Sequence, residues 1–190
     1  MDSWIVQWLN KGVGTFGIWD EFIKAMMSDY LVPVSCSLVM VGLWFHGSKY
    51  LDRESNQIMV CIAAGGIGAA NLMIAVLNSF YFRLRPFEVL DLNLLFYEPT
   101  DSSFPANFAA VGFAVATAVF MKNKKLGLFL GLLTLLGGGG RVYAGVHYPS
   151  DIVGGVIIGM FASFIAYRIS KMIPWVLRIF LKLARRIHFA

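Results

Sequence analysis

Hydrophobic residues follow one another along this chain in long runs that few polar residues interrupt. Five runs approach the length of roughly 20 residues that a helix needs to cross the apolar core of a membrane. They cover residues of about 30–47, 57–80, 105–121, 126–143 and 150–170. The pattern therefore predicts five transmembrane helices.

The two ends of the chain have a different pattern. Residues 1–30 are too broken by glycine and charged residues to cross a membrane, but apolar residues from Trp4 to Leu9 recur at helical spacing. We expect one or two interfacial helices there, and no cleaved signal peptide. In the tail, residues 168–190, basic and apolar residues interleave, which favours a basic amphipathic helix on an anionic membrane surface over a sixth span.

Composition gives the same class of protein. Hydrophobic residues make up 58% of the chain and charged residues 14%, which is far from the composition of a soluble globule. We expect an all-α, integral membrane helical bundle, about five transmembrane helices plus the interfacial helices, forming one domain over residues 1–190. The net charge of +5 is explained by membrane topology and lipid attraction, and indicates no nucleic-acid partner. The sequence indicates no protein partner.

Basic residues are distributed unevenly between the two sides of the predicted bundle. Eleven of the sixteen Lys and Arg residues lie in the 46–56 loop, in the 122–125 loop and in the tail, and five lie on the other side. Because basic residues are retained in the cytoplasm, the side with eleven is predicted to be cytoplasmic.

Polar residues on the other side gather where four predicted helices end or begin. They are Arg83, Arg85, Arg141, His147 and Asp151. Charged groups at membrane depth are costly and commonly mark a functional site. Each also has a structural explanation, since an arginine at a helix end can extend to lipid head groups, and a histidine and an aspartate four residues apart can cap a helix.

The glycine run at residues 137–140 stands beside this cluster. It lacks the Gly-Lys-Ser/Thr ending of a phosphate-binding loop. We therefore interpret the run as a surface for close helix packing.

Taken together, three stretches resemble signatures of the type-2 phosphatidic acid phosphatase superfamily of membrane lipid phosphatases. RVYAGVHYPSD, residues 141–151, resembles the third signature, in which Arg, His and Asp are separated by five and three residues. NSFYFRLRP resembles the first, with Asn78 where a lysine is usual. SSFPANFAA resembles the second, with Phe108 where a histidine is usual. The resemblance covers residues of about 57–170.

The resemblance implies hydrolysis of a phosphate group from a membrane lipid phosphate or diphosphate, without metal or other cofactor. His147 would attack phosphorus to form a phosphohistidine, and Asp151 would orient its imidazole. Arginines stabilise the charge of a transferring phosphoryl group. That role falls to Arg85 and Arg141, with Arg83 beside them. Further substrate contacts are expected from Asn78, Pro105, Ala106 and Asn107.

Two other histidines are potential metal ligands. His46 is placed on the opposite membrane side, and His188 lies in the tail. Neither completes a metal site.

Phe108 is the main departure from the family pattern. The histidine expected there would protonate the leaving oxygen, and such help accelerates a reaction by roughly 10² to 10⁴. Three explanations are open: an engineered or accidental inactivation, a natural pseudoenzyme that binds lipid phosphates, or a substrate whose leaving group hardly needs a proton, such as a diphosphate. We favour the first, because the other catalytic positions remain. A lipid-binding or transport protein on the same scaffold is the rival class.

The substrate is expected to be an amphiphile that enters from the outer leaflet. The 87–104 loop contains four acidic residues and no Lys or Arg, which suggests a lid over the site. The resemblance is to small enzymes of the bacterial inner membrane that act on undecaprenyl diphosphate, phosphatidylglycerol phosphate or the 1-phosphate of lipid A. We expect that membrane, with the site facing the periplasm.

Overall fold

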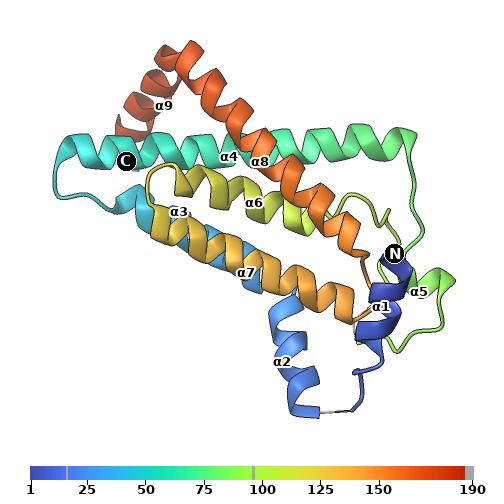
Figure 1. Ribbon diagram of the computed structural model, residues 1–190. Helices are drawn as coiled ribbons and strands as arrows, with labels where there is room; N and C mark the ends of the chain where they lie inside the picture. The colour runs from blue at the N-terminus through green and yellow to red at the C-terminus, as the bar shows by residue number, and fades with distance from the viewer. Residues whose placement is uncertain (16, 96, 187–190) are drawn as a thin grey trace.

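The protein is described by a computed structural model that covers residues 1–15, 17–95 and 97–186. Within these residues all regular secondary structure is helical, as predicted (Figure 1). The elements are α1 (Asp2–Asn10), α2 (Gly17–Met27), α3 (Leu31–Phe45), α4 (Tyr50–Phe80), α5 (Pro86–Val89), α6 (Asn107–Phe120), α7 (Lys124–Tyr143), α8 (Pro149–Met172) and α9 (Pro174–Arg186).

Helix α6 lies at the centre of the bundle, in contact with α3, α4, α7 and α8 (Figure 1). Its sequence is rich in alanine, and Ala109, Ala110 and Ala114 are fully buried. The facing side of α8 carries glycines, and a Cβ atom at Gly159 would lie 2.2 Å from the carbonyl oxygen of Ala110. Small residues on both helices thus allow their backbones to approach closely, as is common in membrane bundles.

All five predicted runs are helical, but they differ in length. Helices α4, α7 and α8 are long and apolar enough to cross a membrane, and α2 with α3 qualifies as one span bent by 47°. By length and composition the described residues therefore hold three spans, or four with the bent pair. Helix α6, with 14 residues, is shorter than a full span. A helix that packs against several other helices, as α6 does, is also hydrophobic along its length. The hydropathy of the 105–121 run therefore does not by itself show that the helix crosses the membrane.

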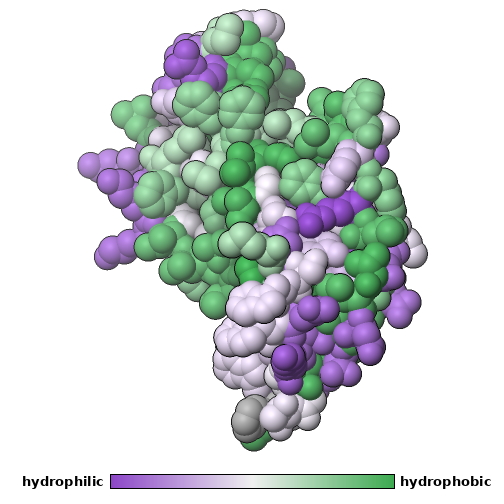
Figure 2. All heavy atoms as spheres, turned by 45° about the vertical axis from the view of Figure 1, so that its right-hand side comes forward, coloured by the Kyte–Doolittle hydropathy of each residue, from purple (hydrophilic) through white to green (hydrophobic). Residues whose placement is uncertain are grey.

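The outer surface of the bundle is apolar. Large side chains such as Leu132 of α7 and Ile157 of α8 are more than half exposed. Figure 2 shows a broad hydrophobic surface in green over the upper part of the view, with hydrophilic side chains at its left margin and across its lower right. This surface is the one expected of a multi-pass membrane protein.

The predicted end helices are present. Helices α1 and α2 are short and pack on the end of α7, and a Cβ atom at Gly137 would lie 2.9 Å from the carbonyl oxygen of Met26 in α2. The glycine run therefore serves helix packing, as predicted. In α9, Leu181 and Ala184 pack on Trp44 while Arg178, Lys182 and Arg186 are exposed. Residues 187–190, with His188, lie outside the described residues.

Candidate active site

A cavity of about 300 Å³ opens at the end of the bundle where α6 and α8 begin and α7 ends. Five of the predicted site residues line it together: Arg85, Asn107, Phe108, Arg141 and His147. Other parts of its wall come from the α2–α3 connection and from the segment that precedes α6. Four regions that are far apart in sequence thus meet at one end of the bundle, on the right of Figure 1.

His147 is buried and held at both ring nitrogens. Its Nδ1 atom lies 3.0 Å from the carbonyl oxygen of Ser103, and its Nε2 atom lies 3.2 Å from Nη1 of Arg85. A carbonyl oxygen can only accept a hydrogen bond, so this contact assigns the proton to Nδ1. The lone pair of Nε2 then lies on the side of the guanidinium and the cavity, which is the arrangement a nucleophile needs.

Electrostatics keep this imidazole neutral. Burial lowers the pKa of His147 below its usual value, and the positive charges of Arg85 and Arg141 lower it further. Asp151 acts in the opposite direction but does not outweigh them. A neutral imidazole is the form that can attack phosphorus.

Asp151 does not bond directly to the imidazole, in contrast to the predicted pair. Its Oδ2 atom is 3.8 Å from Nδ1 of His147, beyond hydrogen-bond distance. Its carboxylate instead accepts hydrogen bonds from the Ser103 hydroxyl at 2.5 Å and the Tyr148 backbone N–H at 2.8 Å. Asp151 therefore positions Ser103, and the carbonyl of Ser103 holds His147.

Sequence reasoning did not identify Ser103 as a functional residue. It stands in the stretch that resembles the second signature, just before the residues to which a role was given. The available signal was a serine pair beside that motif. The sequence does not show which backbone carbonyl contacts the imidazole, because every residue has one.

Arg83 lies outside the cavity wall, and the expected phosphate contact is not what the structure shows for it. Its Nη1 atom is 2.6 Å from Oδ1 of Asp151, and its Nη2 atom is 3.1 Å from Oδ2 of Asp2. The guanidinium also lies over the ring of Tyr148, at 4.0 Å from the ring centre. Asp151 is fully buried and needs a compensating cation, which explains why Arg83 turns toward it.

Each of the two arginines in the cavity is paired with an aspartate. Nη2 of Arg85 lies 2.7 Å from Oδ1 of Asp101, and Nη2 of Arg141 lies 2.5 Å from Oδ1 of Asp29. Both carboxylates also line the cavity. Their oxygens occupy donor positions that phosphate oxygens could take, because both are acceptors for a guanidinium.

These two aspartates were not predicted as site residues. Asp101 belongs to the acidic 87–104 loop, whose charge was noted, whereas Asp29 stands between α2 and α3, far from any motif. Tyr97, on the same loop as Asp101, lines the cavity as well.

Phe108 lines the cavity at the start of α6. The Cζ atom of Arg141 lies 4.2 Å from the centre of its ring. Its own Cζ atom would be 2.7 Å from a Cβ atom at Gly137, so the ring fills space that only a glycine there leaves open. The position offers no group that can donate a proton to a leaving oxygen.

Of the four residues predicted to make further substrate contacts, only one lines the cavity. Asn107 lines the cavity beside Phe108, whereas Pro105 and Ala106 are buried and do not. The N–H of Ala106 donates to the backbone oxygen of Asp151 at 3.1 Å, which joins α6 to α8 behind the site. Asn78 lies in the last turn of α4, away from the cavity wall.

In residues 1–15, 17–95 and 97–186, no three His, Cys, Asp or Glu side chains come together as a metal site would require.

Comparison with known proteins gives the same family. A family model described as the PAP2 superfamily matches residues 59–175. The chain is similar to the undecaprenyl-diphosphatase BcrC of Bacillus subtilis (strain 168), with 29% identity over 171 residues that cover 90% of this chain and 83% of the relative.

Two crystal structures have similar folds. Aquifex aeolicus LpxE has a TM-score of 0.64 and 27% identity, and the match covers 86% of this chain and 92% of that one. A transmembrane PAP2 type phosphatidylglycerolphosphate phosphatase from Bacillus subtilis has a TM-score of 0.63 and 22% identity, covering 90% of this chain and 85% of that one.

Proposed function

The chain belongs to the PAP2 superfamily of membrane lipid phosphatases, and from the composition of its cavity we propose that it hydrolyses a lipid diphosphate. The observation that carries this proposal is the combination of a neutral histidine, two arginines and an aromatic ring in one cavity. The first three provide a nucleophile and a phosphate-binding site. The ring of Phe108 stands where a proton donor would be needed for an alcohol to leave.

The reaction takes place in two displacements. Nε2 of His147 attacks the terminal phosphorus, a nitrogen–phosphorus bond forms, and the bond to the bridging oxygen breaks. Arg85 and Arg141 stabilise the negative charge on the phosphoryl oxygens in the transition state. Water then attacks the phosphohistidine, releases inorganic phosphate and restores the neutral imidazole.

The leaving group determines whether Phe108 is an obstacle. A lipid monoester releases an alkoxide, which requires a proton at once. A lipid diphosphate releases a lipid monophosphate, whose second pKa is about 6, so its oxygen leaves as a stable anion near neutral pH. A site without an acid at residue 108 therefore favours diphosphates. The similarity to a protein named undecaprenyl-diphosphatase supports a long-chain isoprenyl diphosphate as the substrate class.

Phosphate release from farnesyl diphosphate and farnesyl monophosphate tests the proposal. With purified protein in detergent, we expect kcat for the diphosphate to exceed that for the monoester by about 10² or more, the size of a missing general-acid contribution. His147→Ala serves as the control for contaminating phosphatases. Equal rates on the two substrates would refute the preference, and no activity on either would support the inactivated chain favoured from the sequence.

We also propose that this cavity faces the periplasm of a bacterial inner membrane. The proposal is supported by the eleven Lys and Arg residues at the opposite side, against five at the cavity side. In a chain whose native cysteines are replaced by serine, an impermeant thiol reagent added to intact cells should label Glu98→Cys and spare Lys124→Cys. The reverse labelling pattern would overturn the orientation.

A further inference from the structure

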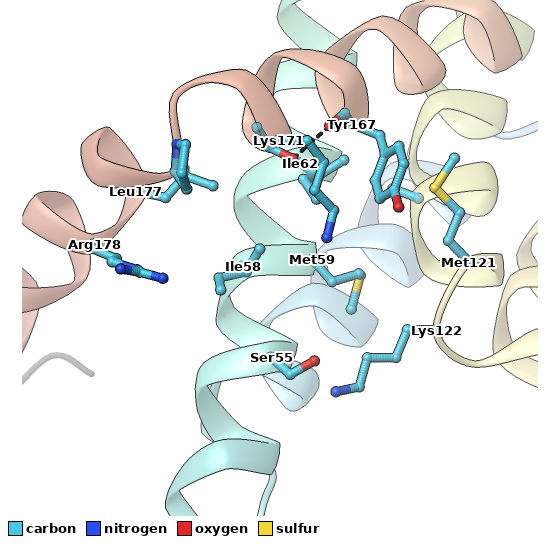
Figure 3. Close-up of a pocket in the computed structure, with 13 residues that line it drawn as sticks. Ser55, Ile58, Met59, Ile62, Met121, Lys122, Tyr167, Lys171, Leu177 and Arg178 are labelled. Atoms are coloured by element: carbon cyan, nitrogen blue, oxygen red, sulfur yellow. Dashed lines mark hydrogen bonds between the residues drawn. The ribbon is translucent and has the colours of Figure 1, made fainter.

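A second cavity, of about 420 Å³, lies at the opposite end of the bundle from the site (Figure 3). Its wall is formed by the first half of α4, the end of α6, the end of α8 and the start of α9. Helix α8 begins beside the active site and ends beside this second cavity, and its 24 residues span about 36 Å. The second cavity is therefore too far from the active site to take part in the hydrolytic reaction.

Three cations from three separate segments surround this cavity. Lys122 follows α6, Lys171 belongs to the last turn of α8, and Arg178 belongs to α9. In Figure 3 the ammonium groups of Lys122 and Lys171 lie on either side of the Met59 side chain. The fold thus brings like charges together at a place where their mutual repulsion is unfavourable.

No carboxylate in the described part of the chain compensates these charges. The cavity wall contains no Asp or Glu, and none of the three cations forms an ion pair among the described residues. By contrast, Arg185 on the same helix as Arg178 is paired with Glu54 at 3.7 Å. The charge at the second cavity therefore suits an anion from outside the chain.

The floor of the cavity is apolar. Met59, Ile62 and Ala118 are buried beneath the cations, and Leu177 of α9 forms part of the wall. Ser55 and Tyr167 contribute hydroxyl groups to the lining. A ligand that fits both parts has a negatively charged head and a hydrocarbon chain.

We propose that this cavity binds an anionic phospholipid of the membrane leaflet on that side. Its phosphate is bound by Lys122, Lys171 and Arg178, and the upper part of an acyl chain lies against Met59, Ile62 and Leu177. The amphipathic helix α9 buries Leu181 and Ala184 against the bundle and leaves Lys182 and Arg186 exposed, which places this end of the bundle at head-group depth. The apolar floor is the reason to expect a lipid here and not a free phosphate ion.

Lipid retained by the purified protein tests the proposal. The protein is reconstituted with equal amounts of phosphatidylglycerol and phosphatidylcholine, extracted in detergent, and its bound lipids are counted by mass spectrometry. We expect phosphatidylglycerol to be retained over phosphatidylcholine. The variant Lys122→Gln/Lys171→Gln/Arg178→Gln should retain it about a hundredfold less, because each of the three basic residues near an anionic lipid contributes roughly a factor of five.

A matched control removes the same charge from the same end of the bundle. Lys49, Lys125 and Lys182 are exposed there and do not line the cavity. Their triple exchange to Gln should leave retention within about twofold of the parent protein, since an attraction due to surface charge alone would affect both variants equally. Equal losses in the two variants, or no preference for phosphatidylglycerol in the parent, would overturn the proposal.

A soluble competitor distinguishes lipid from free phosphate. Excess glycerol phosphate or inorganic phosphate should not displace the retained lipid, because neither contacts the apolar floor. If either ion displaced the lipid as effectively as added phosphatidylglycerol does, the cavity would be a site for anions only. That result would refute the proposal that it binds a lipid. Hydrolysis at His147 serves as the folding control for every variant, and if the triple variant does not fold, Lys122→Gln/Lys171→Gln replaces it.

Discussion

The guanidinium of Arg141 lies over the ring of Phe108, with its Cζ atom 4.2 Å from the ring centre. The aromatic side chain that stands where the family has a proton donor therefore also supports one of the two arginines that face the cavity. A contact of this kind contributes on the order of 0.5–2 kcal/mol. We therefore expect an exchange at position 108 to affect the binding of phosphate as well as the fate of the leaving group.

Exchange of Phe108 for His should change the two substrate classes differently. We expect Phe108→His to raise kcat for a lipid monoester by roughly 10² to 10⁴, because a positioned imidazole can protonate the alkoxide. The diphosphate should gain much less, since its leaving group is already stable. The measurement is kcat for both variants on a matched monoester and diphosphate.

Fast cleavage of the monoester by the unmodified chain would contradict this prediction. If it already cleaves the monoester as fast as Phe108→His, another group supplies the proton. Tyr97 lines the same cavity, and burial raises the pKa of its hydroxyl above the usual value, so this group keeps its proton at neutral pH. Tyr97→Phe in the unmodified chain would then be expected to remove monoester hydrolysis.

Removal of the nucleophile and of its support should have unequal effects. His147→Ala should reduce phosphate release to background. A carboxylate bonded directly to a catalytic histidine contributes about 10⁴ in kcat. Asp151 acts here through Ser103, so Asp151→Asn should cost less, about 10²-fold. A loss for Asp151→Asn as large as that for His147→Ala would show that the carboxylate contacts the imidazole during the reaction.

The acid limb of the pH profile should lie at unusually low pH. Burial, together with Arg85 and Arg141, lowers the pKa of His147 below 6.5. Because the neutral imidazole is the proposed nucleophile, kcat/KM should be full above this lowered pKa and should fall only as pH decreases through it. Arg85→Gln removes a nearby positive charge and should move the acid limb toward higher pH. The same exchange should also weaken the binding of the substrate phosphate. A limb at or above pH 6.5 in the unmodified protein would contradict the electrostatic account.

Asp101 should compete with phosphate for Arg85. Its carboxylate lies 2.7 Å from Nη2 of Arg85 and is 69% exposed, so the pair is accessible to exchange. An exposed ion pair contributes about 0.2–1 kcal/mol, so Asp101→Asn should tighten inhibition by inorganic phosphate by up to about fivefold.

Glu98→Gln is the matched control for this change, because Glu98 is exposed on the same loop and does not line the cavity. Inhibition constants for phosphate should therefore differ between the two variants. The same value in both would mean that phosphate binds without displacing Asp101.

The sequence by itself determined the helices and the end of the bundle at which the chemistry gathers. Long apolar runs can only satisfy their backbone groups as helices in a membrane, and consecutive spans must end on alternate sides. Arg85, Arg141 and His147 were therefore predicted to share one end, and the structure places all three in one cavity. The basic amphipathic character of the last helix was likewise readable from the spacing of its residues.

Only the tertiary structure decided how the side chains at that end are paired. His147 is held by a carbonyl 44 residues away, Arg83 turns from the cavity to Asp151, and Arg141 meets an aspartate 112 residues away. Helical periodicity fixes the height and the face of a residue along its own helix. The partner of a buried polar group is chosen by competition among all donors and acceptors within about 3 Å, and that competition exists only after the helices have packed.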